Sequence, residues 1–232
     1  MPSRFIVLLF AGLTLSAPVL HYGCVGRPAD QAIPWEGVKP PSVGTPRLHA
    51  HYEIVLGAIE RPAHVKERYG AMVITHAASS TGSMNMAEDQ LVKLIWLPPE
   101  GRLPFVLLNK GEHAITLSWD DAAYVDVSGR THRVLHSNVR PWNSGDSQAP
   151  AMVLSNDRLA DFLLPVENAP VGSTGWTLSP LFPCTNGLYC DHQAAVALQG
   201  LTYRVLLPLR VGLETFRYVF TFQVKTVEIR RD

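Results

Sequence analysis

The stretch "FRYVFTFQVK", residues 216–225, decides the fold class of this chain. Its large apolar side chains recur at every second position, and polar side chains fill most of the positions between them. The apolar set is Phe216, Tyr218, Phe220, Phe222 and Val224. A period of two places all five on one face of an extended strand. Four aromatic residues on one face and polar residues on the other predict a half-buried antiparallel strand.

Further strand signals lie upstream of this stretch. The expected partner of the last strand is the segment 203–211, in which Pro208 predicts a sheet edge or a bulge. Other short apolar or alternating runs occupy 52–58, 72–75, 91–97, 105–108, 114–119, 122–127 and 131–135. We expect Ser128-Gly129 to form a two-residue hairpin turn that sets Tyr124 opposite Arg133. Many short strands with turns between them predict an antiparallel β-sandwich over residues 48–232.

Two segments are harder to assign. Residues 79–86, "SSTGSMNM", have the composition of a loop. Residues 156–164, "NDRLADFLL", fit a helix capped by Asn156 and fit equally well a strand that enters Pro165.

One stretch of this β-rich chain is similar to a known class of domain. Residues 106–135, "VLLNKGEHAITLSWDDAAYVDVSGRTHRVL", resemble the strand–turn–strand opening of immunoglobulin-like extracytoplasmic domains in bacterial lipoproteins. The resemblance implies an all-β, immunoglobulin-like sandwich and a location in the cell envelope. It transfers no functional residue to this chain.

The N-terminus has the layout of a secretory signal. A basic residue, Arg4, precedes an uncharged run over 5–15, and Pro18 and Gly23 follow. The run is shorter than the roughly 20 apolar residues of a spanning helix. The alternative is a buried N-terminal helix. We therefore expect residues 1–23 to be a signal peptide.

Gly23-Cys24 resembles the end of a bacterial lipobox. Leu20 stands one place too early, and His21 and Tyr22 fill positions that usually hold an aliphatic and a small residue. The resemblance implies cleavage before Cys24 and lipid attachment to it, with cleavage by the ordinary signal peptidase as the rival. Lipid on Cys24 would anchor the chain to a membrane. Val25 stands where an aspartate favours inner-membrane retention, so the outer membrane is the expected one. Residues 24–47 contain five prolines and read as an extended tether.

The cysteine count supports the same compartment. The chain has 3 cysteines, and if Cys24 carries lipid then Cys184 and Cys190 remain to pair as a disulfide in an oxidising compartment. The alternative is a metal site completed by Asp191 and His192. Cys-x5-Cys is not a usual zinc spacing, so we expect the disulfide and no metal.

Charge and composition limit the partners. The chain carries 20 Lys+Arg and 20 Asp+Glu, a balance without the basic surplus of a nucleic-acid-binding protein. The hydrophobic fraction of 47% is enough for a real core. No cofactor motif is present, and neither is a nucleophile elbow, an H-E-x-x-H zinc motif or a P-loop.

Several residues remain as candidates for a site. Asp120-Asp121 offers two carboxylates, but neighbours on a strand point to opposite faces, so we expect a charged turn. His49 and His51 share one face of a strand without a third metal ligand in view. Trp142 and Trp176 lie in loops, where they act either as binding anchors or as caps of the core.

These observations predict a lipid-anchored, extracytoplasmic and non-catalytic protein that binds or supports another envelope protein. The alternatives are an exported hydrolase with a site of scattered Asp and His residues, and a carrier of a small ligand such as a glycan or a metal.

Overall fold

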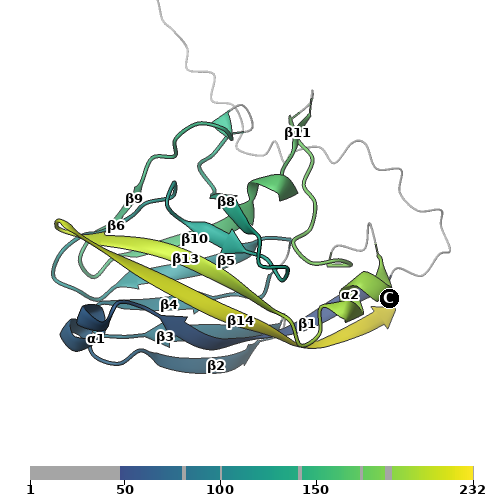
Figure 1. Cartoon of the computed structure of the whole chain (residues 1–232), viewed down its shortest axis with the longest axis horizontal. Helices are drawn as coiled ribbons and strands as arrows, with labels where there is room; N and C mark the ends of the chain where they lie inside the picture. The colour runs from purple at the N-terminus through teal and green to yellow at the C-terminus, as the bar shows by residue number, and fades with distance from the viewer. Residues whose placement is uncertain are drawn as a thin grey trace, which may run out of the picture. The chain divides into compact units, whose positions relative to one another are not determined.

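A computed structural model of the chain describes residues 48–79, 82–99, 101–140, 143–172, 175–185 and 190–231. The expected signal peptide (1–23) and tether (24–47), together with Cys24 and Trp142, lie outside these residues. The described part of the chain is all-β, and all of its strand pairings are antiparallel (Figure 1).

The strands are short except for the first and the last. They are β1 Leu48–Glu60, β2 Val73–Ser79, β3 Gly82–Glu88, β4 Val92–Trp96, β5 Leu103–Asn109, β6 Ile115–Leu117, β7 Ala123–Val125, β8 Thr131–Leu135, β9 Ala151–Val153, β10 Arg158–Pro165, β11 Val171–Gly172, β12 Gly175–Trp176, β13 Thr202–Val211 and β14 Glu214–Arg231. The helices are α1 Ala63–Tyr69, α2 His192–Ala197 and the 3-10 turn η2 Val166–Asn168.

Twelve of these strands form one ladder, in the order β1-β14-β13-β7-β8-β10-β5-β4-β3-β2, and β6 and β9 branch from β13. The ladder curls until β1 comes next to β3. The side chain of Asn85 on β3 bridges the gap: its Oδ1 accepts from the N–H of Leu56 at 2.8 Å, and its Nδ2 donates to the carbonyl of Ile54 at 3.0 Å. The sheet is therefore a nearly closed barrel, and not clearly the pair of packed sheets that defines a sandwich.

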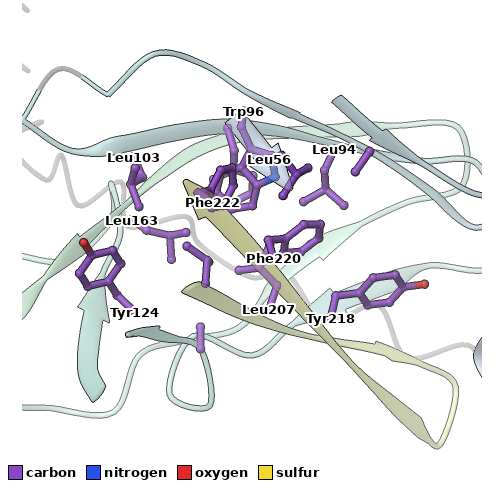
Figure 2. Close-up of a cluster of buried hydrophobic side chains, with 14 of the residues drawn as sticks. Leu56, Leu94, Trp96, Leu103, Tyr124, Leu163, Leu207, Tyr218, Phe220 and Phe222 are labelled. Carbon is purple, nitrogen blue, oxygen red and sulfur yellow. The ribbon is translucent and has the colours of Figure 1, made fainter. Parts of the chain in front are cut away.

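Aromatic side chains fill the interior. Phe216, Tyr218, Phe220, Phe222 and Val224 on β14 are all buried, as their period of two predicted. Figure 2 shows Phe220 and Phe222 gathered with Trp96 of β4 and with leucines from several strands. The Trp96 ring centroid lies 5.3 Å from that of Phe220 and 5.2 Å from that of Phe222, both edge to face. This geometry is favourable between aromatic rings and adds to the free energy of burial.

The expected partner of β14 is confirmed, but Pro208 lies neither at an edge nor in a bulge. β13 pairs with β14 along one side, and with β7 and then β6 along the other. Pro208 falls between the segment paired with β7, which ends at Leu206, and the segment paired with β6, which begins at Leu209. A residue without an N–H is tolerated there, because neither partner strand extends across the gap.

The expectation of a loop over 79–86 is wrong for Ser79 and for residues 82–86, which belong to strands. Gly82–Glu88 is a strand, paired with β2 on one side and with β4 on the other. Its buried positions include Asn85 and Ala87. The composition of small and polar residues resembles that of a loop, yet this segment is a strand. Its main inward side chain is the Asn85 amide, which hydrogen-bonds to backbone groups.

The expected register of the β7–β8 hairpin is also wrong. Tyr124 lies opposite His132, and Arg133 lies opposite Ala123. The loop spans five residues, because the carboxylate of Asp126 accepts from the N–H groups of Ser128 and Arg130 and holds a wider turn than the Ser-Gly pair alone would make.

The ambiguous segment 156–164 is resolved as a strand. Asn156 has a positive φ of 60° in the preceding turn, and β10 runs from Arg158 to Pro165 beside β5. A residue in the left-handed region ends one extended run and allows the chain to reverse into the next.

Candidate functional site

The predicted pairing of Cys184 with Cys190 is present. The two Sγ atoms are bonded at 2.14 Å across six positions of sequence. Cys184 is completely buried and Cys190 is half-buried. Since the chain has 3 cysteines, the bond leaves Cys24 without an intramolecular partner among them.

His192 lies next to the disulfide. Its Nδ1 atom lies 2.9 Å from Cys190 Sγ, at the exposed start of α2. The Sγ atoms and one ring nitrogen of His192 all lie within 4.8 Å of one another. The metal-site alternative named Asp191 as well, but its carboxylate accepts from the N–H of Ala194 and caps α2. The structure thus brings together three of the four side chains of that alternative.

Cys184 is held in place by the strand β1. The N–H of Ala50 donates to the carbonyl of Cys184 at 3.0 Å, and the hydroxyl of Tyr52 donates to the carbonyl of Pro183 at 2.5 Å. Phe182 packs its buried ring against those of Tyr52 and Tyr203. These contacts tie the backbone on the Cys184 side to the barrel without the disulfide.

Cys190 and His192 are held by a different element. Helix α2 buries Ala195, and its chain continues into the contact between the N–H of Gly200 and the carbonyl of Val224 on β14. The N–H of Val224 returns a bond to the carbonyl of Leu201. The second half of the site is therefore attached to β14, independently of the first half on β1.

The two tryptophans do not form a site in the described residues. Trp176 on β12 is half-buried, and it packs against the small cluster of Leu135, Leu164 and Ala169. Of the two roles that the sequence left open for it, this contact favours a cap over the small core cluster. Trp142 lies outside the described residues, so the role expected for it stays a prediction.

Asp120 anchors a loop. Its Oδ1 accepts from Arg133 Nη2 at 3.0 Å and from the N–H of Gln148 at 3.0 Å, and its Oδ2 accepts from the hydroxyl of Ser147. These bonds, led by the one from Ser147, lower the pKa of Asp120. Asp121 points elsewhere and accepts from Ser118 Oγ at 2.8 Å. The adjacent carboxylates therefore serve a charged turn, in line with the expectation for this pair.

His49 and His51 lie on β1, opposite Arg230 and Glu228 of β14. Both are half-exposed. Neither belongs to a group of three potential metal ligands among the described residues. His49 and His51 therefore lie on the outer face of β1, without a metal-binding arrangement among the described residues.

A histidine between two carboxylates was not foreseen. His132 on β8 has its Nε2 2.8 Å from Asp126 Oδ2 and its Nδ1 3.0 Å from Glu167 Oε2. The hydrogen bond to Asp126 raises the pKa of His132; burial opposes this rise, and Glu167 reinforces it. Burial also opposes ionisation of Asp126, but hydrogen bonds from Ser128, His132 and Arg130 outweigh it and hold the pKa of that carboxyl well below its usual range.

A second unforeseen pair is deeper. His136 is buried, stacks on the indole of Trp119 with ring centroids 4.2 Å apart, and places its Nδ1 3.3 Å from Asp161 Oδ2. Burial opposes ionisation of Asp161, but bonds from His136 and from the N–H groups of Ser137 and Phe162 prevail and lower its pKa. The side chains of His136 and Asp161 are both almost fully buried, and their contact holds β10 against the end of β8.

A third polar group, Asp89, follows the end of β3. It accepts from Arg61 Nη1 at 2.5 Å and from Tyr218 Oη at 3.0 Å, and its other oxygen accepts from the N–H groups of Leu91 and Val92. The side chains of Arg61 and Asp89, which form an ion pair, are both almost fully buried. No short-range pattern predicts these three groups in full, because each includes a contact between residues far apart in the chain.

Two hollows in the described part of the chain do not bring together the residues of a catalytic site. One, lined by Tyr52, Asn85, Trp96, Tyr203 and Phe222 among others, encloses about 10 Å³, room for about one water molecule. A more open depression of about 450 Å³ is lined by Leu108, Asn109, Lys110, Asn156, Asp157 and Arg158. Its single carboxylate and two cations do not provide the nucleophile and base of a hydrolase.

Within the described residues, no helix is long enough and apolar enough to cross a membrane. Comparison of the chain with protein-family models, with curated proteins and with solved structures found no match.

Proposed function

We propose that this chain is a lipid-anchored, extracytoplasmic and non-catalytic protein that binds or supports another component of a bacterial cell envelope. Lipid on Cys24 would attach it to the membrane, the tether 24–47 would hold the barrel away from the surface, and the outer membrane is the expected location.

The observation that carries the proposal is the use of the cysteines. Cys184 and Cys190 are bonded to each other, and the remaining cysteine stands directly after Gly23, at the end of a sequence with the layout of a secretory signal. Disulfides persist in oxidising compartments, and an odd cysteine in an exported chain requires a separate role. Lipid attachment supplies that role.

The placement of exposed apolar residues supports a binding role. Leu48 lies opposite Arg231, whereas the hairpin between β13 and β14 lies at the other end of β14 (Figure 1). Leu213 at that hairpin is fully exposed. The next strands across, β6 and β9, bring Met152 and Leu154 to the same end, where they are 67% and 58% exposed. This end, the distal apolar end (Met152, Leu154 and Leu213), lies away from the start of β1 and would be open to a partner.

We propose further that the β-domain is immunoglobulin-like. It is supported by the antiparallel strands around one aromatic core and by the resemblance over residues 106–135. The side-chain seam between β1 and β3 would then be a departure from two open sheets.

The location is tested by expressing the full chain and a Cys24→Ser variant in a bacterial host. Intact-mass measurement of the membrane-extracted protein should show a diacyl or triacyl addition on Cys24, and the Cys24→Ser variant should carry none. A mature protein without lipid, or one that begins at another residue, would contradict the proposal.

The binding role is tested by capture from detergent-solubilised envelopes. The full chain and the control Val196→Asp, an exposed residue on α2, should retain the same partner, and Leu213→Asp should lose it. Substrate turnover that Asp120→Asn abolishes while the fold stays intact would favour a hydrolase instead.

A further inference from the structure

We propose that the disulfide is the closed form of a metal site, and that its reduced form binds one Zn²⁺ through Cys184, Cys190 and His192. The inference goes beyond the proposed function and does not depend on lipid attachment or on a partner.

The geometry of the three ligands carries the proposal. The Sγ atoms of Cys184 and Cys190 and one ring nitrogen of His192 lie within 4.8 Å of one another. Ligands at about 2.0–2.3 Å from a tetrahedral zinc are mutually separated by roughly 3–4 Å. Cys190 Sγ and His192 Nδ1, 2.9 Å apart, are already close to this separation. Breaking the bond between the two sulfur atoms lets them move apart toward it.

The surrounding structure keeps the ligands together once the bond is open. The Cys184 side is tied to β1 through the carbonyls of Pro183 and Cys184, and Phe182 is buried among aromatic rings. The Cys190 side is tied to β14 through α2 and the segment that follows it. Because β1 and β14 are paired along their length, both halves stay attached to the same rigid ladder after reduction.

The ligand set fits zinc. Two thiolates and one imidazole suit this borderline-soft cation, and the two negative charges neutralise the ion. The carboxylate of Asp191 is engaged with the N–H of Ala194, so a water molecule would take the fourth position on the exposed side. Half-exposed Cys190 and exposed His192 provide access for the ion.

Formation of the site requires a reductant, which we specify as a dithiol. The dithiol transfers two electrons and two protons to the Cys184–Cys190 bond; two protein thiols form, and the dithiol becomes a cyclic disulfide. Zinc then binds as both thiols lose their protons, so two protons are released for each ion bound. The protein is therefore metal-free when oxidised and zinc-binding when reduced.

The experiment uses the full chain carrying Cys24→Ala, so that no third thiol competes. The protein is reduced with dithiothreitol, freed of reductant without oxygen, and titrated with Co²⁺ as a spectroscopic probe and then with Zn²⁺. We expect one equivalent of Co²⁺ to give thiolate-to-metal charge-transfer absorption and tetrahedral visible bands, and Zn²⁺ to displace it. The oxidised protein should give neither signal.

The variant His192→Gln separates a site from a mere pair of thiols. It should weaken Zn²⁺ binding by more than about tenfold, whereas His113→Gln, at an exposed histidine elsewhere, should bind as the parent does. Circular dichroism of each reduced protein checks that the barrel is retained. A folded reduced protein that binds no Co²⁺, or a His192→Gln variant equal to His113→Gln, would overturn the proposal.

Discussion

The side-chain amide of Asn85 occupies the place of a strand beside Leu56. Its Oδ1 accepts from the N–H of Leu56 at 2.8 Å, and its Nδ2 donates to the carbonyl of Ile54, so one buried side chain satisfies two backbone groups on the open side of β1. The ring of His76 adds a contact to the same oxygen at 2.8 Å. The barrel is thus closed at this point by a side chain and not by a ladder.

Replacement of this amide should be costly. Asn85→Ala leaves one buried donor and one buried acceptor without partners, and we expect a loss of about 2–4 kcal/mol in the free energy of unfolding. Urea unfolding measures it. The exposed Asn138→Ala should change stability by less than about 0.5 kcal/mol. Equal effects of the two changes would show that the seam contributes nothing.

Truncation of the aromatic face of β14 should have a larger effect. Phe220 is completely buried against Trp96, so Phe220→Ala should lower the free energy of unfolding by about 3–5 kcal/mol. Leu213→Ala removes an apolar side chain that is already in water, and it should leave the denaturation midpoint unchanged. A Phe220→Ala variant as stable as Leu213→Ala would contradict the packing described here.

The charge on His132 should make stability depend on pH. Its pKa is raised in the folded protein, so protonation stabilises the fold. This contribution is fully present below the unfolded pKa of about 6.5 and is lost as pH rises through the folded pKa. Urea unfolding from about pH 5 to pH 9 should therefore show stability falling with pH in the parent and in His113→Gln, and less steeply in His132→Gln. Parallel curves for His132→Gln and the parent would refute the role of this group.

Loss of the Asp120 carboxylate should loosen one loop. Asp120→Asn weakens the bonds to Arg133, Ser147 and the N–H of Gln148, and amide hydrogen exchange over 144–148 should accelerate while the barrel strands stay protected. Because the pKa of Asp120 is lowered, the parent should lose this protection as pH falls from the unfolded pKa of about 3.9 through the folded value. The neighbouring Asp121→Asn serves as the control and should leave exchange in 144–148 unaltered.

Reduction of the disulfide should cost little stability. The bond closes a short loop, for which the loss of chain entropy in the unfolded state corresponds to about 2 kcal/mol. Cys184→Ser/Cys190→Ser, measured without metal, should remain folded with its unfolding free energy lowered by about that amount. Global unfolding of the variant would show that the anchors on β1 and β14 do not hold the segment by themselves.

The periodic parts of the fold were predictable from sequence, and the polar parts were not. The alternating apolar residues from Phe216 to Val224 predict β14, because burial of one face of a strand gives a period of two. β3 was missed, since its inward Asn85 is buried for its hydrogen bonds and not for its hydrophobicity. The predicted register of the β7–β8 hairpin was wrong for a similar reason, because the side chain of Asp126 widens the loop.

The candidate site divides in the same way. Cysteine arithmetic predicted the bond between Cys184 and Cys190, and the adjacent His192 was visible in the same few residues. The contact of His132 with Glu167 and that of His136 with Asp161 join separate elements that only the folded topology brings together. Residue spacing carries no record of such long-range contacts.

The pairing of β1 with β14 also constrains the order in which the molecule is built. The strand that leaves the ribosome first among those described is the one whose ladder partner leaves last. Closing so long a loop costs chain entropy before any contact repays it, and topologies of this kind fold slowly. Until β14 arrives, β1 has an unpaired edge with apolar side chains, which is the usual starting point for aggregation. Of the described strands, β1 therefore waits longest for its ladder partner during synthesis.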